Sequence, residues 1–179
     1  MTNANPQNLV LSIYPFTRGF AFVLFEGPGS PFDWGVKEIK EKHKNTKTLD
    51  DIKTLIDRYR PEVLVIEDTS NGESRRTSRI RRLYRVLVHL AVAEYIDLCR
   101  LKKSQIKECF GLVGAGSKYE IAQAIAIQIP AFAHRIPPFR KPWMSDDLRQ
   151  ALFDAAALGL AFYALRGHPS DEIPERIFP

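Results

Sequence analysis

The chain has 179 residues and a formal net charge of +5, with 45% hydrophobic and 26% charged side chains, the composition of an ordinary soluble folded domain. No apolar run approaches the roughly 20 residues of a membrane-spanning helix, and the N-terminal segment lacks the basic and apolar regions of a secretory signal. The two cysteines form no C-x-x-C pattern and the histidines are scattered, which argues against a zinc site and favours a reducing, cytoplasmic setting. We expect one domain at 9–167 between tails at 1–8 and 168–179.

The first part of the domain predicts three strands. Residues 9–26, LVLSIYPFTRGFAFVLFE, are rich in β-branched and aromatic side chains and are interrupted between Pro15 and Gly19. This pattern predicts two strands joined by a tight turn. A turn rich in glycine and proline at 27–31 then leads to a third strand at 32–39.

A helix and a buried strand are predicted next. After a solvated loop, Thr48 and Asp51 have the spacing of a capping pair, and apolar residues follow at helical spacing until Pro61 ends the pattern. The helix should therefore have about twelve residues. Val63 to Ile66 form an unbroken apolar run, which predicts a strand over 63–67 that is buried on both faces and ends at Glu67, followed by Asp68.

The rest of the chain alternates helices with one more strand. The predicted elements are a helix over 74–94, a strand over 95–101, a short helix over 103–110, a helix opened by a capping box of Ser117 and Glu120 and closed by Pro130, a proline-rich loop, and a last helix over 146–166 capped by Ser145. The order β-β-β-α-β-α-β-α-α predicts an α/β fold with a five-stranded mixed sheet and helices on both faces.

Asp154 is the only charged residue between Ala151 and Leu165 in the stretch QALFDAAALGLAFYALRG at 150–167. The stretch has helix length and ends in Gly167, where a C-cap glycine belongs. A helix this apolar is buried on most sides, and a carboxylate in it must find a partner, a metal or a proton. We therefore expect Asp154 to point into a site, and the alternative is a carboxylate at the rim of the core.

Glu67, Asp154 and Asp147 are candidate ligands of one metal site. Ligand crevices open at the carboxyl ends of buried strands, and Glu67 lies at such an end. Asp147 precedes Asp154 by seven residues, so the two carboxylates should share one face of a helix. Converging carboxylates suit Mg²⁺, and two such ions can promote phosphodiester hydrolysis. The alternative is that Glu67 is a strand-end charge and Asp147 a first-turn residue stabilised by the helix dipole.

The basic residues are clustered. Residues 75–85, RRTSRIRRLYR, contain six arginines. Two smaller groups are Arg100, Lys102, Lys103 and Lys107, and Arg135, Arg140 and Lys141. Closely spaced cations repel one another unless an anion lies among them, so the pattern favours contact with a nucleic acid over a merely solvated surface.

Four segments, taken in their order and spacing, resemble motifs of the RuvC-type Holliday junction resolvases. They are LSIYPFTRGFAF at the first hairpin, VLVIED at the buried strand, VGAGSKYEIAQAI at the helix with the capping box, and FDAAALGLAFY in the last helix. The resemblance covers nearly the whole domain and implies a ribonuclease H-like fold.

The resemblance also implies roles for individual residues. Glu67 and Asp154 would be catalytic carboxylates that bind Mg²⁺ or Mn²⁺, and Lys107 and Lys118 would face DNA near the site. The family's first-strand aspartate falls on Tyr14. A phenol stays protonated at neutral pH and is a poor Mg²⁺ ligand, so metal binding is expected to be weak.

Two functions follow from position 14. Alanines flank Asp154 at the spacing where the family often carries a further ligand, so a metal site would have to be rebuilt from Asp68, Asp147 or Asp146. The chain would then be a Mg²⁺-dependent, structure-selective DNA endonuclease, acting on branched DNA as a homodimer that matches the two scissile strands of a four-way junction. Alternatively, it is a non-catalytic nucleic-acid-binding or assembly protein.

Both functions require contact with a nucleic acid. The residues expected to contact phosphates are Arg75, Arg76, Arg79, Arg82, Lys107 and Lys118.

Overall fold

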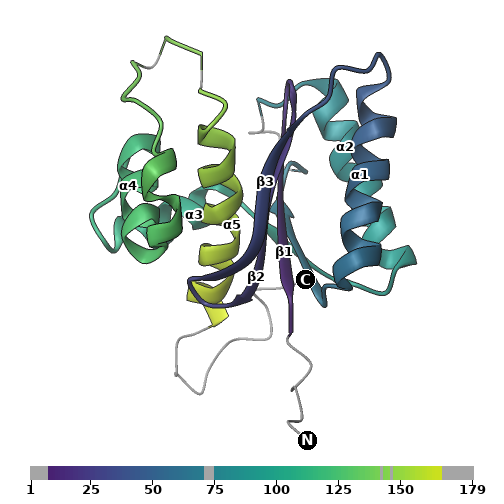
Figure 1. The fold of residues 1–179 in the computed structure, drawn as a ribbon, viewed down its shortest axis with the longest axis horizontal. Helices are drawn as coiled ribbons and strands as arrows, with labels where there is room; N and C mark the ends of the chain where they lie inside the picture. The colour runs from purple at the N-terminus through teal and green to yellow at the C-terminus, as the bar shows by residue number, and fades with distance from the viewer. Residues whose placement is uncertain (1–7, 71–74, 142, 146, 167–179) are drawn as a thin grey trace, which may run out of the picture.

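The computed structural model describes residues 8–70, 75–141, 143–145 and 147–166, and these contain a five-stranded mixed sheet with helices on both faces (Figure 1). The strands are β1 (Val10–Phe16), β2 (Gly19–Gly27), β3 (Ser30–Glu38), β4 (Val63–Glu67) and β5 (Asp97–Leu101). Their order in the sheet is β3-β2-β1-β4-β5. β2 pairs antiparallel with β1 and β3, whereas β4 runs parallel to β1 and β5. The mixed sheet predicted from the sequence is confirmed.

The close approach of β2 to β3 depends on Gly19. A Cβ atom at this position would lie only 1.8 Å from the carbonyl oxygen of Lys37 on β3. No other residue type could therefore let β2 begin so close to its neighbour. From Gly19 onward, the first seven residues of β2 are buried, which places this strand at the centre of the core.

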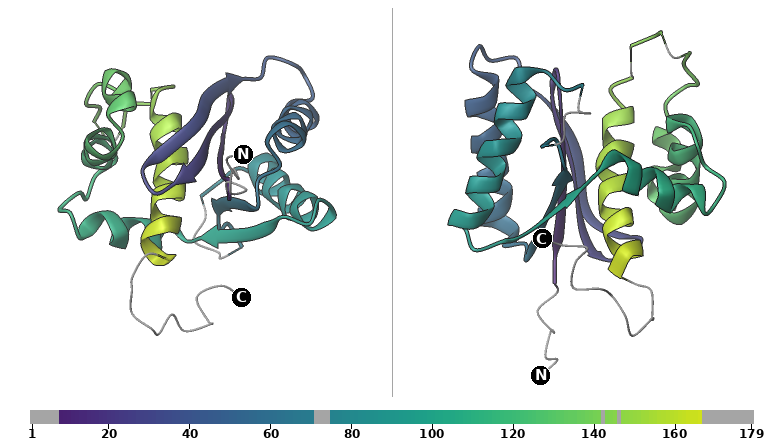
Figure 2. Two further views of the ribbon diagram at one scale, coloured as in Figure 1. Left: turned by 60° about the horizontal axis from the view of Figure 1, so that its bottom comes forward. Right: turned by 180° about the vertical axis from the view of Figure 1, so that it is seen from behind.

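The helices form a layer on each side of the sheet (Figures 1 and 2). α1 (Lys44–Tyr59) and α2 (Ser78–Ala93) cover one face. α5 (Gln150–Arg166) packs on the other face, and α3 (Lys103–Gly111), α4 (Lys118–Gln128) and the 3₁₀ helix η1 (Pro130–Arg135) lie beyond α5. Among the described residues, no helix is long and apolar enough to cross a membrane.

α5 lies close against the sheet because its inner face is small. A Cβ atom on Gly159 would lie 2.1 Å from the ring of Phe25 on β2, so this glycine sets the approach of the helix. Apart from Asp154, the residues from Gln150 to Phe162 are all buried. As the composition of the stretch predicts, α5 is a core helix that contains one carboxylate.

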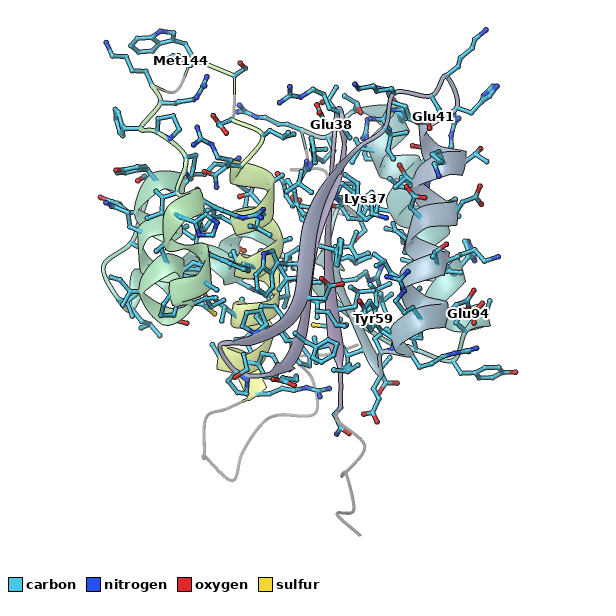
Figure 3. All side chains as sticks on the ribbon, viewed as in Figure 1. Lys37, Glu38, Glu41, Tyr59, Glu94 and Met144 are labelled. Carbon is cyan, nitrogen blue, oxygen red and sulfur yellow. The ribbon has the colours of Figure 1, made fainter. Side chains whose placement is uncertain are left out.

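The start of α1 differs from the prediction. The helix begins at Lys44, so Thr48 lies inside it and is only 1% exposed. Asp51 forms an ion pair at 2.8 Å with Lys47, which lies one turn earlier in the helix. It does not form a capping pair with Thr48. At the other end, the Tyr59 hydroxyl donates to Asp33 on β3 at 2.6 Å, on the inner side of α1 (Figure 3).

The starts of α2 and α5 also differ from the prediction. α2 begins at Ser78, because the Thr77 side chain accepts from the backbone N–H of Ile80 as an N-cap. Arg75 therefore precedes the helix. α5 begins at Gln150 and not at 146, so Ser145 does not cap it. By contrast, the capping box of Ser117 and Glu120 that opens α4 is confirmed.

Candidate functional site

A cavity of about 470 Å³ opens at the carboxyl end of β4, where a crevice was predicted. We call it the basic cavity. Its charged and phenolic lining comes from β1, β4, the segment before α2, the β5–α3 region, α4 and α5. These residues are Tyr14, Glu67, Asp68, Arg75, Arg76, Lys102, Lys103, Lys107, Lys118 and Asp154.

Strand pairing brings Tyr14 and Glu67 together. Ser12 of β1 is in parallel register with Val65 of β4, and Tyr14 and Glu67 each follow two residues later. Since side chains two residues apart point to the same face of a sheet, both reach toward the α5 side. Asp154 projects from α5 into the same cavity. Glu67 and Asp154 therefore line the same cavity, and their role as metal ligands stays a prediction.

Arg76 binds the Glu67 carboxylate directly. Its Nη2 donates to Glu67 Oε2 at 2.5 Å, and the two side chains are only 20% and 14% exposed. The guanidinium also lies 4.5 Å from the centroid of the Tyr14 ring and donates to the carbonyl of Pro15 at 3.3 Å. One arginine thus neutralises Glu67 and stacks on the phenol beside it.

Asp154 is satisfied by two neighbours. Lys118 Nζ of α4 lies 3.6 Å from its Oδ2, and the Gln150 side chain one turn earlier donates to its Oδ1 at 3.2 Å. The Asp154 side chain is 16% exposed and lines the cavity, whereas the neighbouring residues of α5 are buried. The carboxylate in the apolar helix therefore meets a cation and an amide where it reaches the cavity.

The phenol of Tyr14 stays neutral. Burial raises its pKa to about 12, and the negative charge of Asp154 adds to the effect. The Arg76 and Lys118 cations oppose the shift without reversing it. At neutral pH, Tyr14 brings no negative charge to the cavity.

A pH titration can test whether the Tyr14 phenol is neutral at ordinary pH. The phenolate absorbance of the unaltered protein, minus that of a Tyr14→Phe variant, should develop near pH 12 and not near the ordinary value of 10. Because the folded-state pKa is raised, the associated stability is fully present below pH 10 and is lost as the pH rises toward 12. A difference signal complete by pH 10, with the far-UV circular dichroism of both proteins unchanged, would contradict the burial of the phenol.

Asp68 is the third carboxylate of the cavity. Burial alone would raise its pKa, but hydrogen bonds from the backbone and side chain of Ser70 outweigh burial, so the pKa is lowered. Across the described residues, no three His, Cys, Asp or Glu side chains come together as a metal-binding group. With Glu67 and Asp154 engaged by cations and Tyr14 neutral, the residues present do not fit a Mg²⁺ site.

The predicted phosphate-contacting residues do not all share this cavity. Arg75, Arg76, Lys107 and Lys118 line it. Arg79 is directed elsewhere, toward the carbonyls of Phe16 and Thr17 and the side chain of Asn45. Arg82 lines a second cavity on the α2 side of the sheet. Lys102 and Lys103 also line the cavity but were not predicted as members of the site, and the available signal was their position directly after β5, which is parallel to β4.

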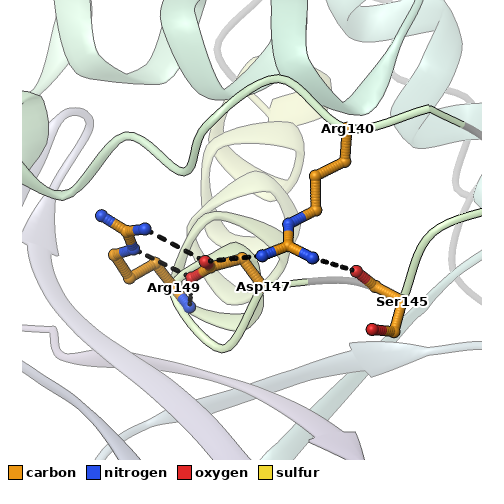
Figure 4. A network of polar contacts seen from close by, with 4 residues as sticks. All are labelled: Arg140, Ser145, Asp147 and Arg149. Carbon is orange, nitrogen blue, oxygen red and sulfur yellow. Dashed lines mark hydrogen bonds and ion pairs between the residues drawn. The ribbon is translucent and has the colours of Figure 1, made fainter.

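Asp147 is not a member of the site, and its predicted place on the last helix was wrong. It precedes α5 and forms a turn in which its backbone carbonyl accepts from Gln150 at 2.9 Å. Its carboxylate accepts from the Arg149 side chain at 2.9 and 3.0 Å and lies 3.5 Å from Arg140, which also donates to the carbonyl of Ser145 (Figure 4). Asp147 thus closes the base of a loop whose outer part includes Met144 (Figure 3). Asp146 and Gly167 lie outside the described residues.

The Asp147 network predicts a pH-dependent contribution to stability. Hydrogen bonds from Arg149 hold the pKa of Asp147 at about 2, so the contribution is fully present above the ordinary value of 3.8 and is lost as the pH falls toward 2. Asp147→Asn should lower the free energy of unfolding at neutral pH by about 1 kcal/mol, a modest value because Arg149 is half exposed. In urea unfolding experiments, the difference in the free energy of unfolding between the unaltered protein and Asp147→Asn should be smaller at pH 3 than at pH 7. A difference independent of pH would contradict the assignment.

Solved structures resemble the fold of this chain, whereas no family model and no curated protein matches the sequence. The Thermus thermophilus RuvC structure matches with a TM-score of 0.61 and 17% identity, covering 89% of this chain and 96% of that chain. T. thermophilus RuvC in complex with a Holliday junction substrate gives 0.60 and 16%, with the same coverage. Yeast mitochondrial Holliday junction resolvase Ydc2 gives 0.60 and 17%, covering 91% of this chain and 80% of that chain. The fold of this chain is ribonuclease H-like.

Proposed function

We propose that the protein binds branched DNA through the basic cavity and cleaves it slowly or not at all. The observation that carries the proposal is the lining of the cavity, in which six basic side chains surround three carboxylates that already have partners. Branched DNA is the substrate class we infer because a structure of the same fold is a complex with a Holliday junction substrate.

Four cations of the cavity are available for phosphates. Arg75, Lys102, Lys103 and Lys107 are exposed and form no ion pair with any other residue in the described part of the chain. They come from two sides of the opening, one before α2 and three around the start of α3. A phosphodiester backbone that enters the cavity would therefore be contacted from both sides.

The arrangement of Arg76 and Lys118 argues for binding over cleavage. A divalent ion needs concentrated negative charge to offset its dehydration. Here each carboxylate that the resemblance singles out lies beside a cation, and the neighbouring phenol is neutral. We infer that a neutral Tyr14, with the cationic Arg76 stacked on it, takes the place of the negative charge that a metal would require.

A second candidate is a Mg²⁺-dependent junction endonuclease. It is favoured by one observation, namely that Glu67, Asp68 and Asp154 line the same cavity together with Lys107 and Lys118. In this case DNA would have to displace Arg76 and Lys118 from the carboxylates before any metal bound. Junction cleavage in Mg²⁺ or Mn²⁺, abolished by Asp154→Asn, would distinguish this candidate from binding alone.

DNA binding can be tested through its salt dependence. Fluorescence anisotropy with a labelled four-way junction should give an affinity that falls steeply with salt, with a log–log slope of about −4 if four phosphates are neutralised. Lys102→Gln/Lys103→Gln should reduce the magnitude of the slope by about 2. The matched control Lys40→Gln/Lys42→Gln, which removes two exposed charges outside the cavity, should leave the slope unchanged. An affinity that barely changes with salt would contradict the proposal.

We further propose that two copies of the chain bind one junction. A four-way junction has two-fold symmetry, and a two-fold dimer would present one basic cavity to each of two opposite strands. Sedimentation of the protein alone and with one equivalent of junction would measure the stoichiometry.

A further inference from the structure

A second cavity, of about 410 Å³, lies against α2 on the other side of β4 from the basic cavity. It differs from the basic cavity in having arginine as its only basic residue type. Its polar lining consists of Glu67, Asp68, Thr69, Ser70, Ser78, Arg81, Arg82, Tyr84, Arg85 and Arg100. We call it the arginine cavity, and α2, its wall, is visible on the α1 side of the sheet (Figure 2).

The arginine cavity has an excess of positive charge. Arg81, Arg82, Arg85 and Arg100 are exposed, and none of their side chains forms a hydrogen bond or ion pair with another residue in the described ranges. Two carboxylates lie on its rim. Glu67 is already paired with Arg76, and Asp68, which is hydrogen-bonded to Ser70, acts electrostatically on Arg100. Four guanidinium groups around one opening repel one another, and an anion would relieve that repulsion.

The neutral part of the lining is rich in hydroxyl groups. Tyr84 belongs to the wall of the cavity but is only 2% exposed, and the charges that act most strongly on its hydroxyl are those of Arg76 and Glu67, so it is not counted as a donor to a ligand here. Thr69, Ser70 and Ser78 add further hydroxyl groups to the same opening.

We propose that the arginine cavity binds a phosphate group, at a site separate from the basic cavity. Guanidinium groups favour this ligand because their paired N–H donors match two oxygens of one phosphate. The source that the proposed function supplies is the backbone of the bound junction, and in that respect the inference rests on the proposed function. The two cavities share Glu67 and Asp68, so one DNA molecule bent around the end of β4 would reach both. Free inorganic phosphate is the other source of the same chemistry.

The test compares two double variants that each remove two positive charges. Arg82→Gln/Arg85→Gln changes two exposed residues of the arginine cavity, and Lys53→Gln/Arg58→Gln changes two exposed residues of α1 that line neither cavity. Calorimetric titration with inorganic phosphate and anisotropy with the labelled junction are measured for each protein and for the unaltered chain. Circular dichroism establishes that all three are folded.

The expected result is a loss of about 10-fold in junction affinity and a salt slope reduced by about 2 in Arg82→Gln/Arg85→Gln only. If that variant instead loses phosphate binding while its junction affinity stays unchanged, the site is supported and free phosphate is its ligand. Equal junction and phosphate affinities in the two double variants would overturn the proposal. Failure of the unaltered chain to bind the junction would refute the proposed function, whereas the phosphate titration would still decide the arginine cavity.

Discussion

Arg76→Ala should lower the free energy of unfolding by about 2–3 kcal/mol, the largest single effect on stability that we expect at the site. The substitution leaves the Glu67 carboxylate, only 14% exposed, without the cation that binds it. Removing one partner of a fully buried ion pair costs about 3–5 kcal/mol, and the partial exposure of both side chains reduces this value. The stacking of Arg76 on Tyr14 is lost as well. Urea unfolding at neutral pH measures the change.

Two further variants separate the ion pair from other effects of truncation. Glu67→Gln in the Arg76→Ala background should recover most of the lost stability, because an amide is far less costly to leave unpaired than a carboxylate. Arg75→Ala is the matched control, since Arg75 lines the same cavity, is exposed and should change stability by less than about 0.5 kcal/mol. Equal effects of Arg75→Ala and Arg76→Ala would show that the contact with Glu67 contributes little.

Much of the fold could be predicted from hydrophobic patterning. The strand order along the chain, the buried strand that ends at Glu67 and the apolar helix with Asp154 all follow from local apolar spacing. The capping box at Ser117 was also readable, because both of its hydrogen bonds form within four residues. These features share one property, which is that short-range sequence determines them.

Helix starts were less predictable where tertiary contacts decide them. Thr48 looks like a capping residue, but it is buried, and the helix extends back to Lys44. Asp147 looks like a first-turn acid, but its carboxylate binds Arg149 and Arg140, and the chain turns before α5 begins. At Thr48 burial in the core overrides the local signal, and at Asp147 ion pairs with two nearby arginines do so.

The lining of the cavity was predictable only in part, because Asp147 lies elsewhere and the sequence did not separate the arginines that line the cavity from those that do not. Glu67 and Asp154 stand out because a carboxylate next to a buried run is rare. Nothing local distinguishes Arg76 from Arg79, three residues later, yet one binds Glu67 and the other binds the β1–β2 turn. Arg76 lies in the segment before α2, whereas Arg79 lies in the first turn of α2. The partner of each guanidinium group therefore depends on how β1, β4 and α2 pack together, which the local sequence does not reveal.

The variant Tyr14→Asp/Arg76→Ala should bind Mg²⁺ at least about 10-fold more tightly than the unaltered protein, which we expect to bind it weakly. The pair of changes adds one carboxylate and removes one cation beside Glu67. A change of two charges within one cavity exceeds the roughly 1.4 kcal/mol that a 10-fold effect requires, even at a high effective dielectric constant. Tyr14→Asp alone should gain less, because Arg76 would pair with the new carboxylate as well as with Glu67. Calorimetric titration with Mg²⁺ and with Mn²⁺ measures the affinity.

The matched control is Tyr14→Asn/Arg76→Ala, which removes the same phenol and the same cation and adds an amide of nearly equal size. It should gain less Mg²⁺ affinity than the aspartate variant, because it lacks the added negative charge. Metal binding should also raise the unfolding midpoint of the aspartate variant, since the ion replaces the lost partner of Glu67. Cleavage of a labelled four-way junction by both variants and the unaltered chain completes the comparison. Robust cleavage by the unaltered chain in Mg²⁺, lost in Asp154→Asn, would mean that Glu67 and Asp154 support catalysis despite Tyr14 and Arg76, and would replace binding alone with the endonuclease.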